Sequence, residues 1–174
     1  IAMMMFAFHG RVRVMQMVEE LSLKDQQLGI YNIAYFMKYT GKLIGQRKIG
    51  NYAACYFNLR RFSVVNQQLG RERGTQVLKT FIADLQAHLS EQEIVCRIGG
   101  DNFIVLFLKK HMEYVRDYLK GTGILYDEER KERVKISAYA GYYMIPEECS
   151  GPADIMDRVS VALNIAKNVL HSYS

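Results

Sequence analysis

The residues best suited to chemistry form a short turn, Gly99-Gly100-Asp101-Asn102, between two apolar runs. Glycine takes positive φ without strain, so a Gly-Gly pair between apolar runs predicts a hairpin. A carboxylate at the tip of such a hairpin is exposed while the strands beside it are buried. The glycines let a bulky anionic ligand approach the backbone, and Asp101 could help to hold a metal ion on the phosphates of that ligand. Taken alone, the pattern also fits an ordinary turn, since Asp and Asn are common turn residues.

Helices and strands alternate around this turn. Apolar residues at helical spacing predict helices over residues 14–23, 32–44, 62–69, 73–89, 111–120 and 152–170. Short apolar runs bounded by turn residues predict strands over residues 52–59, 93–98, 103–108 and 133–145, the last interrupted at Gly141. A hairpin with helices before and after it predicts an α+β fold, in which helices flank a central, mostly antiparallel sheet.

The composition limits the classes of protein to which the chain can belong. Its 174 residues are 49% hydrophobic and 24% charged, which fits one globular domain with an appendage and excludes disordered, collagenous and rod-like proteins. The net charge of +5 suits an anionic ligand such as a nucleotide and is too small to require nucleic acid. Three cysteines without CxxC spacing argue against disulfides and zinc, and favour a cytoplasmic location.

The N-terminal segment predicts a helix whose role stays open. The chain begins with Ile1, so we expect a piece of a longer protein. Residues 1–8 are apolar but too few to cross a bilayer, which takes about 20 residues. Either they end a membrane helix that tethers the domain through segments upstream of residue 1, or they belong to a linker between domains. Gly10 predicts a break, so we expect any helix pairing to centre on residues 12–23.

Several motifs in order resemble the GGDEF family, the diguanylate cyclase domains of bacterial signal transduction. The hairpin stretch from Gly99 to Phe103 is similar to the signature that names the family, with GGDNF in place of GGDEF. Further matches at the family's spacing are residues 25–32, residues 58–66, the pair Gly70 and Gly74, and residues 162–167. The resemblance covers roughly residues 25–167 and is specific because several motifs agree. It divides the chain into an N-terminal linker or signalling helix, residues 1–24, and a GGDEF-like domain, residues 25–174.

The resemblance implies a fold, a reaction and a set of site residues. The fold is related to polymerase palm domains and class III nucleotidyl cyclases. The family condenses two GTP molecules into cyclic di-GMP, using two monomers and Mg²⁺. The implied catalytic residue is Asp101, and the implied substrate-binding residues are Asn66, Gly99, Gly100 and Lys167.

The metal positions of the family are depleted of charge in this sequence. They fall on Asn58, Leu59 and Asn102. The family's acidic positions fall on Asn58, Asp101 and Asn102, and of these three only Asp101 is still an acid. An amide oxygen can touch Mg²⁺ but brings no net charge, and two such losses weaken metal binding. We therefore expect Asp101 to be vestigial and no metal or other cofactor to bind, with Mg²⁺ relevant only if cyclase activity remains.

Other family positions also differ. Asn66 keeps the guanine-reading asparagine, but Thr75 replaces the second, acidic guanine contact and Ser63 replaces a phosphate-facing lysine. Ser90 removes the arginine of the family's inhibitory product site, R-x-x-D, so we expect no inhibitory cyclic di-GMP site. Arg60 replaces the second acid of the strand motif; either it attracts a phosphate or it is a solvated or salt-bridged arginine.

These departures predict a degenerate GGDEF domain, a regulatory or dimerising module that has lost cyclase activity and keeps at most weak GTP binding. The expected partner is a second copy of the chain or an adjacent domain such as a cyclic di-GMP phosphodiesterase. The first alternative is an active diguanylate cyclase with unusual metal ligands. The second is a nucleic-acid-binding α+β domain. The sequence has no RNP-like aromatic run, which argues against this alternative, so no nucleic-acid partner is expected.

Overall fold

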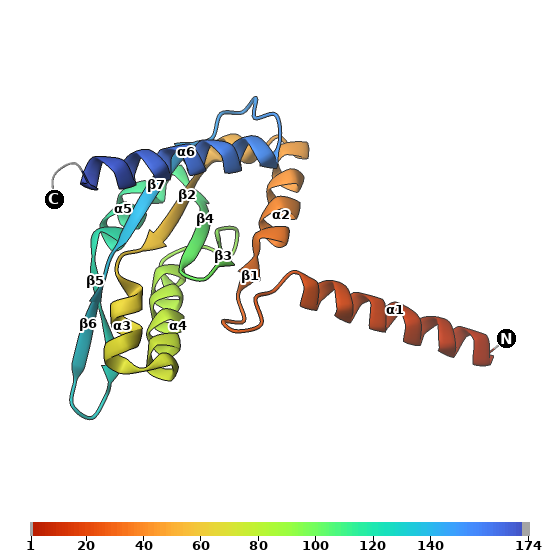
Figure 1. The fold of residues 1–174 in the computed structure, drawn as a ribbon. Coiled ribbons are helices and arrows are strands. Elements are labelled where there is room, and N and C mark those ends of the chain that lie inside the picture. The colour runs from red at the N-terminus through yellow and green to blue at the C-terminus, as the bar shows by residue number, and fades with distance from the viewer. Residues whose placement is uncertain (1, 172–174) are drawn as a thin grey trace.

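Figure 1 shows the chain in a computed structural model, which describes residues 2–171. The helices are α1 (Ala2–Ser22), α2 (Ile33–Gly45), α3 (Phe62–Leu69), α4 (Arg71–Ala87), α5 (Met112–Lys120) and α6 (Pro152–His171). The strands are β1 (Tyr31–Asn32), β2 (Tyr52–Leu59), β3 (Ile94–Gly99), β4 (Asn102–Leu108), β5 (Thr122–Asp127), β6 (Glu132–Ile136) and β7 (Ala138–Met144). Two 3-10 turns, η1 (Ile49–Asn51) and η2 (Lys109–His111), join these elements.

A five-stranded sheet forms the centre of the fold, in the order β1-β3-β4-β2-β7. The short strand β1 runs parallel to β3, and every other neighbouring pair in this sheet is antiparallel. Strands β5 and β6 form a separate antiparallel hairpin at the side of the molecule. The predicted α+β class, with a mostly antiparallel sheet between helices, is confirmed.

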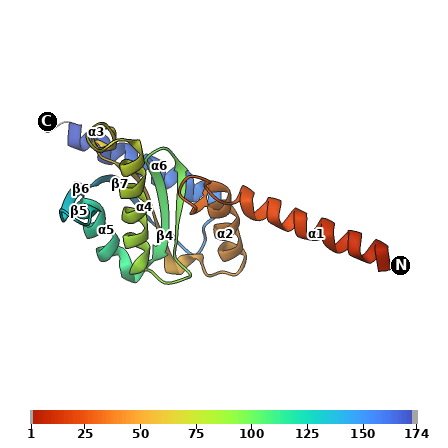
Figure 2. The ribbon, with the colours of Figure 1, turned by 90° about the horizontal axis from the view of Figure 1, so that it is seen from below.

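Helices cover both faces of the sheet and create two apolar cores (Figure 2). On one face α3, α4 and α5 pack over the inward side chains of β2 and β4, where Phe57 stacks on Phe103 with ring centroids 5.4 Å apart. On the other face α2 and α6 pack over alternate residues of the same strands, and Phe36 and Ile104 are fully buried. Burial on both faces explains why the central strands are nearly continuous apolar runs.

The strand predicted over residues 133–145 is wrong in one respect, because it is two strands. The break lies at Ser137, whose carbonyl accepts a 2.8 Å hydrogen bond from the Arg60 backbone N–H, and β7 then joins the central sheet. Gly141 lies inside β7, where a Cβ would overlap the α6 backbone at Ala162 and Leu163. This glycine therefore permits close helix–sheet packing. Strands β1 and β5 also lie outside the prediction, the first because its two residues pair only through tertiary contact with β3.

Helix α1 projects away from the rest of the chain (Figures 1 and 2). It runs without interruption through Gly10, so the predicted break there is wrong; one glycine costs a helix only about 1 kcal/mol. The side chains of residues 3–22 are all exposed. Within residues 2–171, no helix combines the length and apolarity needed to span a bilayer.

Candidate functional site

The end of β2 and the turn of the β3–β4 hairpin meet at one corner of the sheet. The antiparallel register places Asn58 opposite Asn102, and the Leu59 backbone N–H donates a 3.1 Å hydrogen bond to the Asp101 carbonyl. Gly100 has a φ of 57°, in the left-handed region that favours glycine. The fold therefore brings together the positions Asn58, Asp101 and Asn102, which are acidic in the family that the sequence resembles.

The side-chain amide of Asn58 binds the other two residues of this corner. Its nitrogen donates to Asp101 Oδ1 at 3.0 Å, to Asn102 Oδ1 at 3.2 Å and to the Asp101 carbonyl at 3.4 Å. The Asn102 amide in turn donates to the Gly99 carbonyl at 3.2 Å. An N–H donor thus lies among oxygens that would otherwise be free for a cation, and Asp101 supplies the only negative charge of the three side chains.

The donor set at this corner does not fit a magnesium ion. Mg²⁺ binds through carboxylates and phosphates in a strict octahedral arrangement, and one carboxylate that is already hydrogen-bonded is a weak ligand set. Nowhere in residues 2–171 do three or more His, Cys, Asp or Glu side chains gather in a way that could hold a metal. The corner offers polar groups to a ligand, and Asp101 is the one carboxylate among its three side chains.

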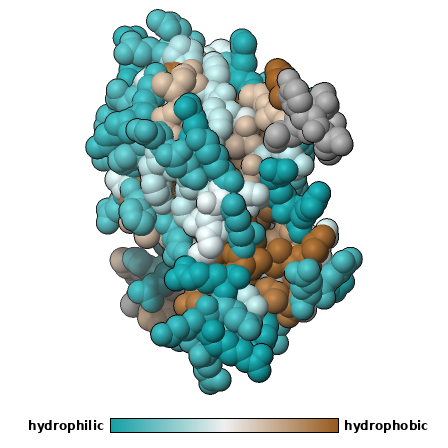
Figure 3. Space-filling view, turned by 90° about the vertical axis from the view of Figure 1, so that its left-hand side faces the viewer, coloured by the Kyte–Doolittle hydropathy of each residue, from teal (hydrophilic) through white to brown (hydrophobic). Residues whose placement is uncertain are grey.

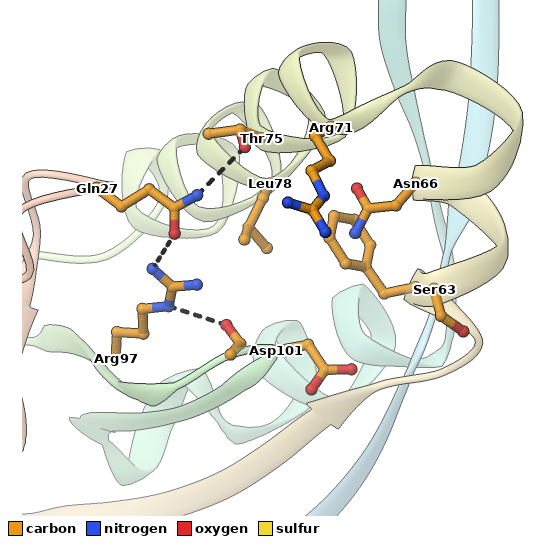
Figure 4. Close-up of a pocket in the computed structure, with 10 residues that line it drawn as sticks. Gln27, Ser63, Asn66, Arg71, Thr75, Leu78, Arg97 and Asp101 are labelled. Carbon is orange, nitrogen blue, oxygen red and sulfur yellow. Dashed lines mark hydrogen bonds between the residues drawn. The ribbon is translucent and has the colours of Figure 1, made fainter.

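A pocket of about 450 Å³ opens beside the corner (Figure 4). Its lining comes from the turn before β1, from α3 and α4, and from the hairpin: Gln27, Phe62, Ser63, Asn66, Arg71, Thr75, Leu78, Arg97, Gly100 and Asp101. Two arginines and one carboxylate surround an apolar floor of Phe62 and Leu78. This size and mixture of groups suit a small polar ligand with an anionic part.

Asn66 is held against α4 by a glycine. A Cβ on Gly74 would overlap the side-chain oxygen of Asn66, so any larger residue there would displace the Asn66 amide. The Asn66 carbonyl also accepts a 2.9 Å hydrogen bond from the Gly70 N–H, which ends α3. In Figure 4 the Asn66 amide and the Arg71 guanidinium lie next to each other at the rim of the pocket. The paired glycines of the sequence motif therefore position Asn66.

A chain of hydrogen bonds from Arg97 forms the other wall of the pocket. Arg97 donates to the Gly100 carbonyl at 2.9 Å, to Gln27 Oε1 at 2.8 Å and to Asp25 Oδ1 at 3.1 Å. Arg97 forms an ion pair with Asp25, and only 10% of its side chain is exposed. Asp25 therefore largely neutralises the charge of Arg97. Gln27 then donates to the Thr75 hydroxyl at 3.4 Å. Arg97 thus fixes the hairpin turn to the segment before β1.

Thr75 changes what the pocket can recognise. The Watson–Crick edge of guanine presents two N–H donors, which a carboxylate can accept together. The Thr75 hydroxyl has a single oxygen that already accepts a hydrogen bond from Gln27. Asn66 remains able to contact a base, but the pocket lacks the second, acidic acceptor for guanine. Of the two guanine contacts that the resemblance implies, the pocket therefore keeps Asn66 and lacks the acidic one.

The structure brings together part of the predicted site. Asn66, Gly100 and Asp101 line the pocket, whereas Gly99 is exposed at the end of β3 and is outside the lining. Lys167 lies on α6 and is also outside it. Sequence reasoning missed Gln27 and Arg71. Arg71 precedes Thr75 by four residues and therefore lies on the same face of the helix. Because Thr75 matches a guanine-contacting position of the family, this spacing could have placed Arg71 at the pocket.

Arg60 lies on the opposite side of α3 from this pocket. Its guanidinium lies over the Tyr139 ring, with Cζ 4.9 Å from the ring centroid. It forms no ion pair within residues 2–171. The alternative of a salt-bridged Arg60 therefore has no support there, and the two arginines of the pair line a separate groove.

Glu93, the acid that remains of the R-x-x-D motif, is buried and hydrogen-bonded within the fold. Its side chain is fully buried and accepts hydrogen bonds from the Ser90 and Leu108 backbones and from His111. Burial acts to raise the pKa of Glu93, but these hydrogen bonds outweigh it and hold that pKa below its ordinary value. A carboxylate so fully engaged has little capacity left for a ligand.

Comparisons with known proteins agree with this geometry. The sequence model of the family described as "Diguanylate cyclase, GGDEF domain" matches residues 22–171. The response regulator PleD of Caulobacter vibrioides is 27% identical over 89 residues, 50% of this chain and 20% of PleD. The cyclic di-GMP phosphodiesterase PdeB of Shewanella oneidensis is 26% identical over 141 residues, 75% of this chain and 16% of PdeB. The chain therefore spans a fifth or less of the length of these two relatives.

The fold has a counterpart among solved structures. The GGDEF domain of TpbB from Pseudomonas aeruginosa superposes with a TM-score of 0.69 over 83% of this chain and 88% of that domain. The two sequences are 24% identical, so this likeness shows a shared fold. The sheet and the helices on its two faces therefore have the arrangement found in that solved GGDEF domain.

Proposed function

Because the chain belongs to the GGDEF domain family, we propose that it serves cyclic di-GMP signalling as a regulatory, nucleotide-binding module without cyclase activity. The family match over residues 22–171 supports the place in signalling. The proposed loss of catalysis rests on the hairpin corner. There, two amides stand at acidic positions, and the amide of Asn58 is hydrogen-bonded to Asp101 Oδ1.

The reaction of the family depends on charge that this corner does not supply. Attack of a 3′-hydroxyl on an α-phosphate needs its developing negative charge neutralised, which active sites of this kind achieve with metal ions held by carboxylates. Asn58 and Asn102 bring no charge, and Asp101 is tied to the Asn58 amide. The corner can position the backbone around a ligand without promoting the attack.

Nucleotide binding is the activity that the pocket supports. Asn66 offers an amide to a base, and the exposed Arg71 offers a cation to a phosphate at the same rim. Arg97 contributes little free charge because it is paired with Asp25. We expect GTP to bind weakly and to change the state of the domain without being consumed.

The partner of the module is a second copy of the chain or an adjacent domain. Helix α1 exposes large apolar side chains along its length, among them Phe6 at 85% and Met15 at 71%. A lone helix of this kind gains most of its stability by packing against something else. PdeB, of which this chain matches 16%, is named as a cyclic di-GMP phosphodiesterase, and a neighbouring domain of that kind is the partner that we propose for regulation.

Sedimentation separates the two partners. The full chain is compared with a chain that begins at Leu23, at tens of micromolar. We expect the full chain to dimerise and the shortened chain to be monomeric. If both are monomers, α1 is an intramolecular cover or a truncated linker, and the proposal of dimerisation fails.

A cyclase assay tests the central proposal. The purified domain is incubated with GTP and either Mg²⁺ or Mn²⁺, and cyclic di-GMP is measured by chromatography. The GGDEF domain of the diguanylate cyclase TpbB is the positive control. We expect no product from this chain. Turnover at roughly 1 s⁻¹ or more, as is ordinary for enzymes, would establish the alternative of an active cyclase with unusual ligands.

A further inference from the structure

A second groove lies between α3 and β6. It has a volume of about 480 Å³ and is lined by Arg60, Arg61, Val64, Val65, Gln68, Val134, Lys135 and Ser137. Three of these side chains are cationic and three are valines. Figure 3 faces the side of the molecule on which α3, β5 and β6 lie and shows an apolar area in its lower half, rimmed by hydrophilic side chains.

The cations of this groove have no anionic partner among residues 2–171. None of Arg60, Arg61 and Lys135 takes part in an ion pair within that range. The acid at the start of β6, Glu132, accepts a 2.6 Å hydrogen bond from the Tyr126 hydroxyl. Three such cations around one concave surface create a local positive potential that attracts anions.

The guanidinium of Arg60 is already oriented. It lies over the ring of Tyr139, with Cζ 4.9 Å from the centroid. This contact holds the guanidinium beside the groove, and its N–H donors have the geometry to meet two oxygens of a phosphate. The Arg60 side chain therefore loses less conformational entropy when it binds a ligand than a freely rotating arginine would.

The backbone and the floor of the groove also suit a ligand. Strand β6 pairs with β5 along one edge, and among the described strands none pairs with the other edge, which leaves backbone groups available. Val64 is 41% exposed although it lies beside the cations. The cations and the free edge of β6 can donate hydrogen bonds to an anionic group of a ligand, and the valines can contact an uncharged part of it.

We propose that this groove is a second ligand site, in which Arg60, Arg61 and Lys135 bind the phosphate of a nucleotide and the valines contact its base, without a metal ion. The volume lies within the range of small-molecule sites. The site is separate from the pocket beside Asp101, and it does not depend on the function proposed for that pocket. The phosphate can come from a nucleotide or from free pyrophosphate, and the two are separated by experiment.

The test combines location with affinity in the full chain. Methyl resonances of Val64 and Val134 report on the groove and those of Leu78 report on the other pocket, during titration with pyrophosphate, GTP or guanosine in EDTA at low salt. Calorimetry then compares the wild type with an Arg60→Gln/Lys135→Gln variant. A Lys79→Gln/Lys110→Gln variant loses the same charge at exposed positions outside both linings and is the matched control.

We expect GTP and pyrophosphate to shift the valine methyls, and GTP to bind the groove more tightly. The Arg60→Gln/Lys135→Gln variant should lose at least tenfold in affinity for both, which corresponds to about 1.4 kcal/mol, and the control variant less than twofold. Absence of valine shifts at millimolar pyrophosphate and GTP overturns the site. Equal affinity for pyrophosphate and GTP overturns the nucleotide assignment.

Discussion

The β3–β4 hairpin has an acid just before its first strand and another at its turn, and the two differ in burial and in the number of hydrogen bonds they accept. Glu93, just before β3, has a fully buried side chain that accepts hydrogen bonds from Ser90, Leu108 and His111. Asp101, at the turn, is partly exposed on a pocket, and its carboxylate accepts one hydrogen bond from a side chain in the described part of the chain. Both are carboxylates on one rigid hairpin.

The difference shows how burial and donors decide what a carboxylate does. An acid whose lone pairs are all engaged holds its donors in place, and it contributes to the stability of the fold. An acid with lone pairs directed at a pocket contributes little to stability and remains free to meet a ligand. We therefore assign Glu93 to the fold and Asp101 to the site, although sequence spacing makes both of them family site positions.

Removing each carboxylate in turn gives the largest contrast. Glu93→Ala removes a fully buried carboxylate that accepts hydrogen bonds from the Ser90 and Leu108 backbone N–H groups, so we expect a loss of about 2 to 4 kcal/mol in the free energy of unfolding. Asp101→Ala should cost less than about 1 kcal/mol, since the carboxylate is partly exposed. Urea denaturation measures both. Equal losses in the two variants would mean that the distinction between the acids is wrong.

Acid should erase the stability that Glu93 supplies. Its pKa in the folded state lies below the ordinary value of 4.5, so the unfolded chain takes up the proton first as the pH falls. The stabilisation is therefore complete above about pH 4.5 and is lost as the pH falls through the lower, folded value. Glu93→Gln cannot ionise. The difference in unfolding free energy between the wild type and Glu93→Gln should therefore shrink as the pH falls below 4.5, and a difference that stays unchanged there contradicts the prediction.

The core of the fold could be predicted because its signals are local. Residues 52–59 and 62–69 match β2 and α3 at both ends, since Gly50, the arginine pair and Gly70 mark the boundaries. The errors arise where tertiary contacts override local pattern. Gly141 indicated a break but serves the packing of α6, whereas the real break at Ser137 follows from a bond to the distant Arg60 backbone.

The site could be predicted only as far as motif spacing reaches. Asn66, Gly100 and Asp101 lie together because each belongs to a motif whose glycines define its geometry. Gln27 could not be placed, since its contacts with Arg97 and Thr75 join segments about 50 to 70 residues apart. The sequence showed which acids are missing, and the structure adds that an amide N–H contacts the remaining one.

A carboxylate introduced across the pocket from Asp101 should sharpen the comparison. Thr75→Asp supplies the second acceptor for guanine that the hydroxyl cannot provide. We expect about tenfold tighter GTP binding, or about 1.4 kcal/mol, with no gain for ATP. Thr75→Asn is the matched control, because it has a similar size and no charge. Calorimetry measures the affinities, and an equal gain for ATP would show that the pocket does not read the base through this position.

The smallest expected effect is that of metal removal on the wild-type chain. The pocket end of the hairpin has one carboxylate, and that carboxylate accepts a hydrogen bond from Asn58, so GTP affinity should fall less than about threefold in EDTA, under about 0.7 kcal/mol. Asn58→Asp replaces the donor with a second carboxylate, and two adjacent negative charges favour a cation between them. In that variant EDTA should lower GTP affinity at least tenfold. If EDTA already lowers the GTP affinity of the wild type tenfold, the corner holds a working metal site. Asp101 would then bind a cation there, while Glu93 stabilises the fold at the other end of the hairpin.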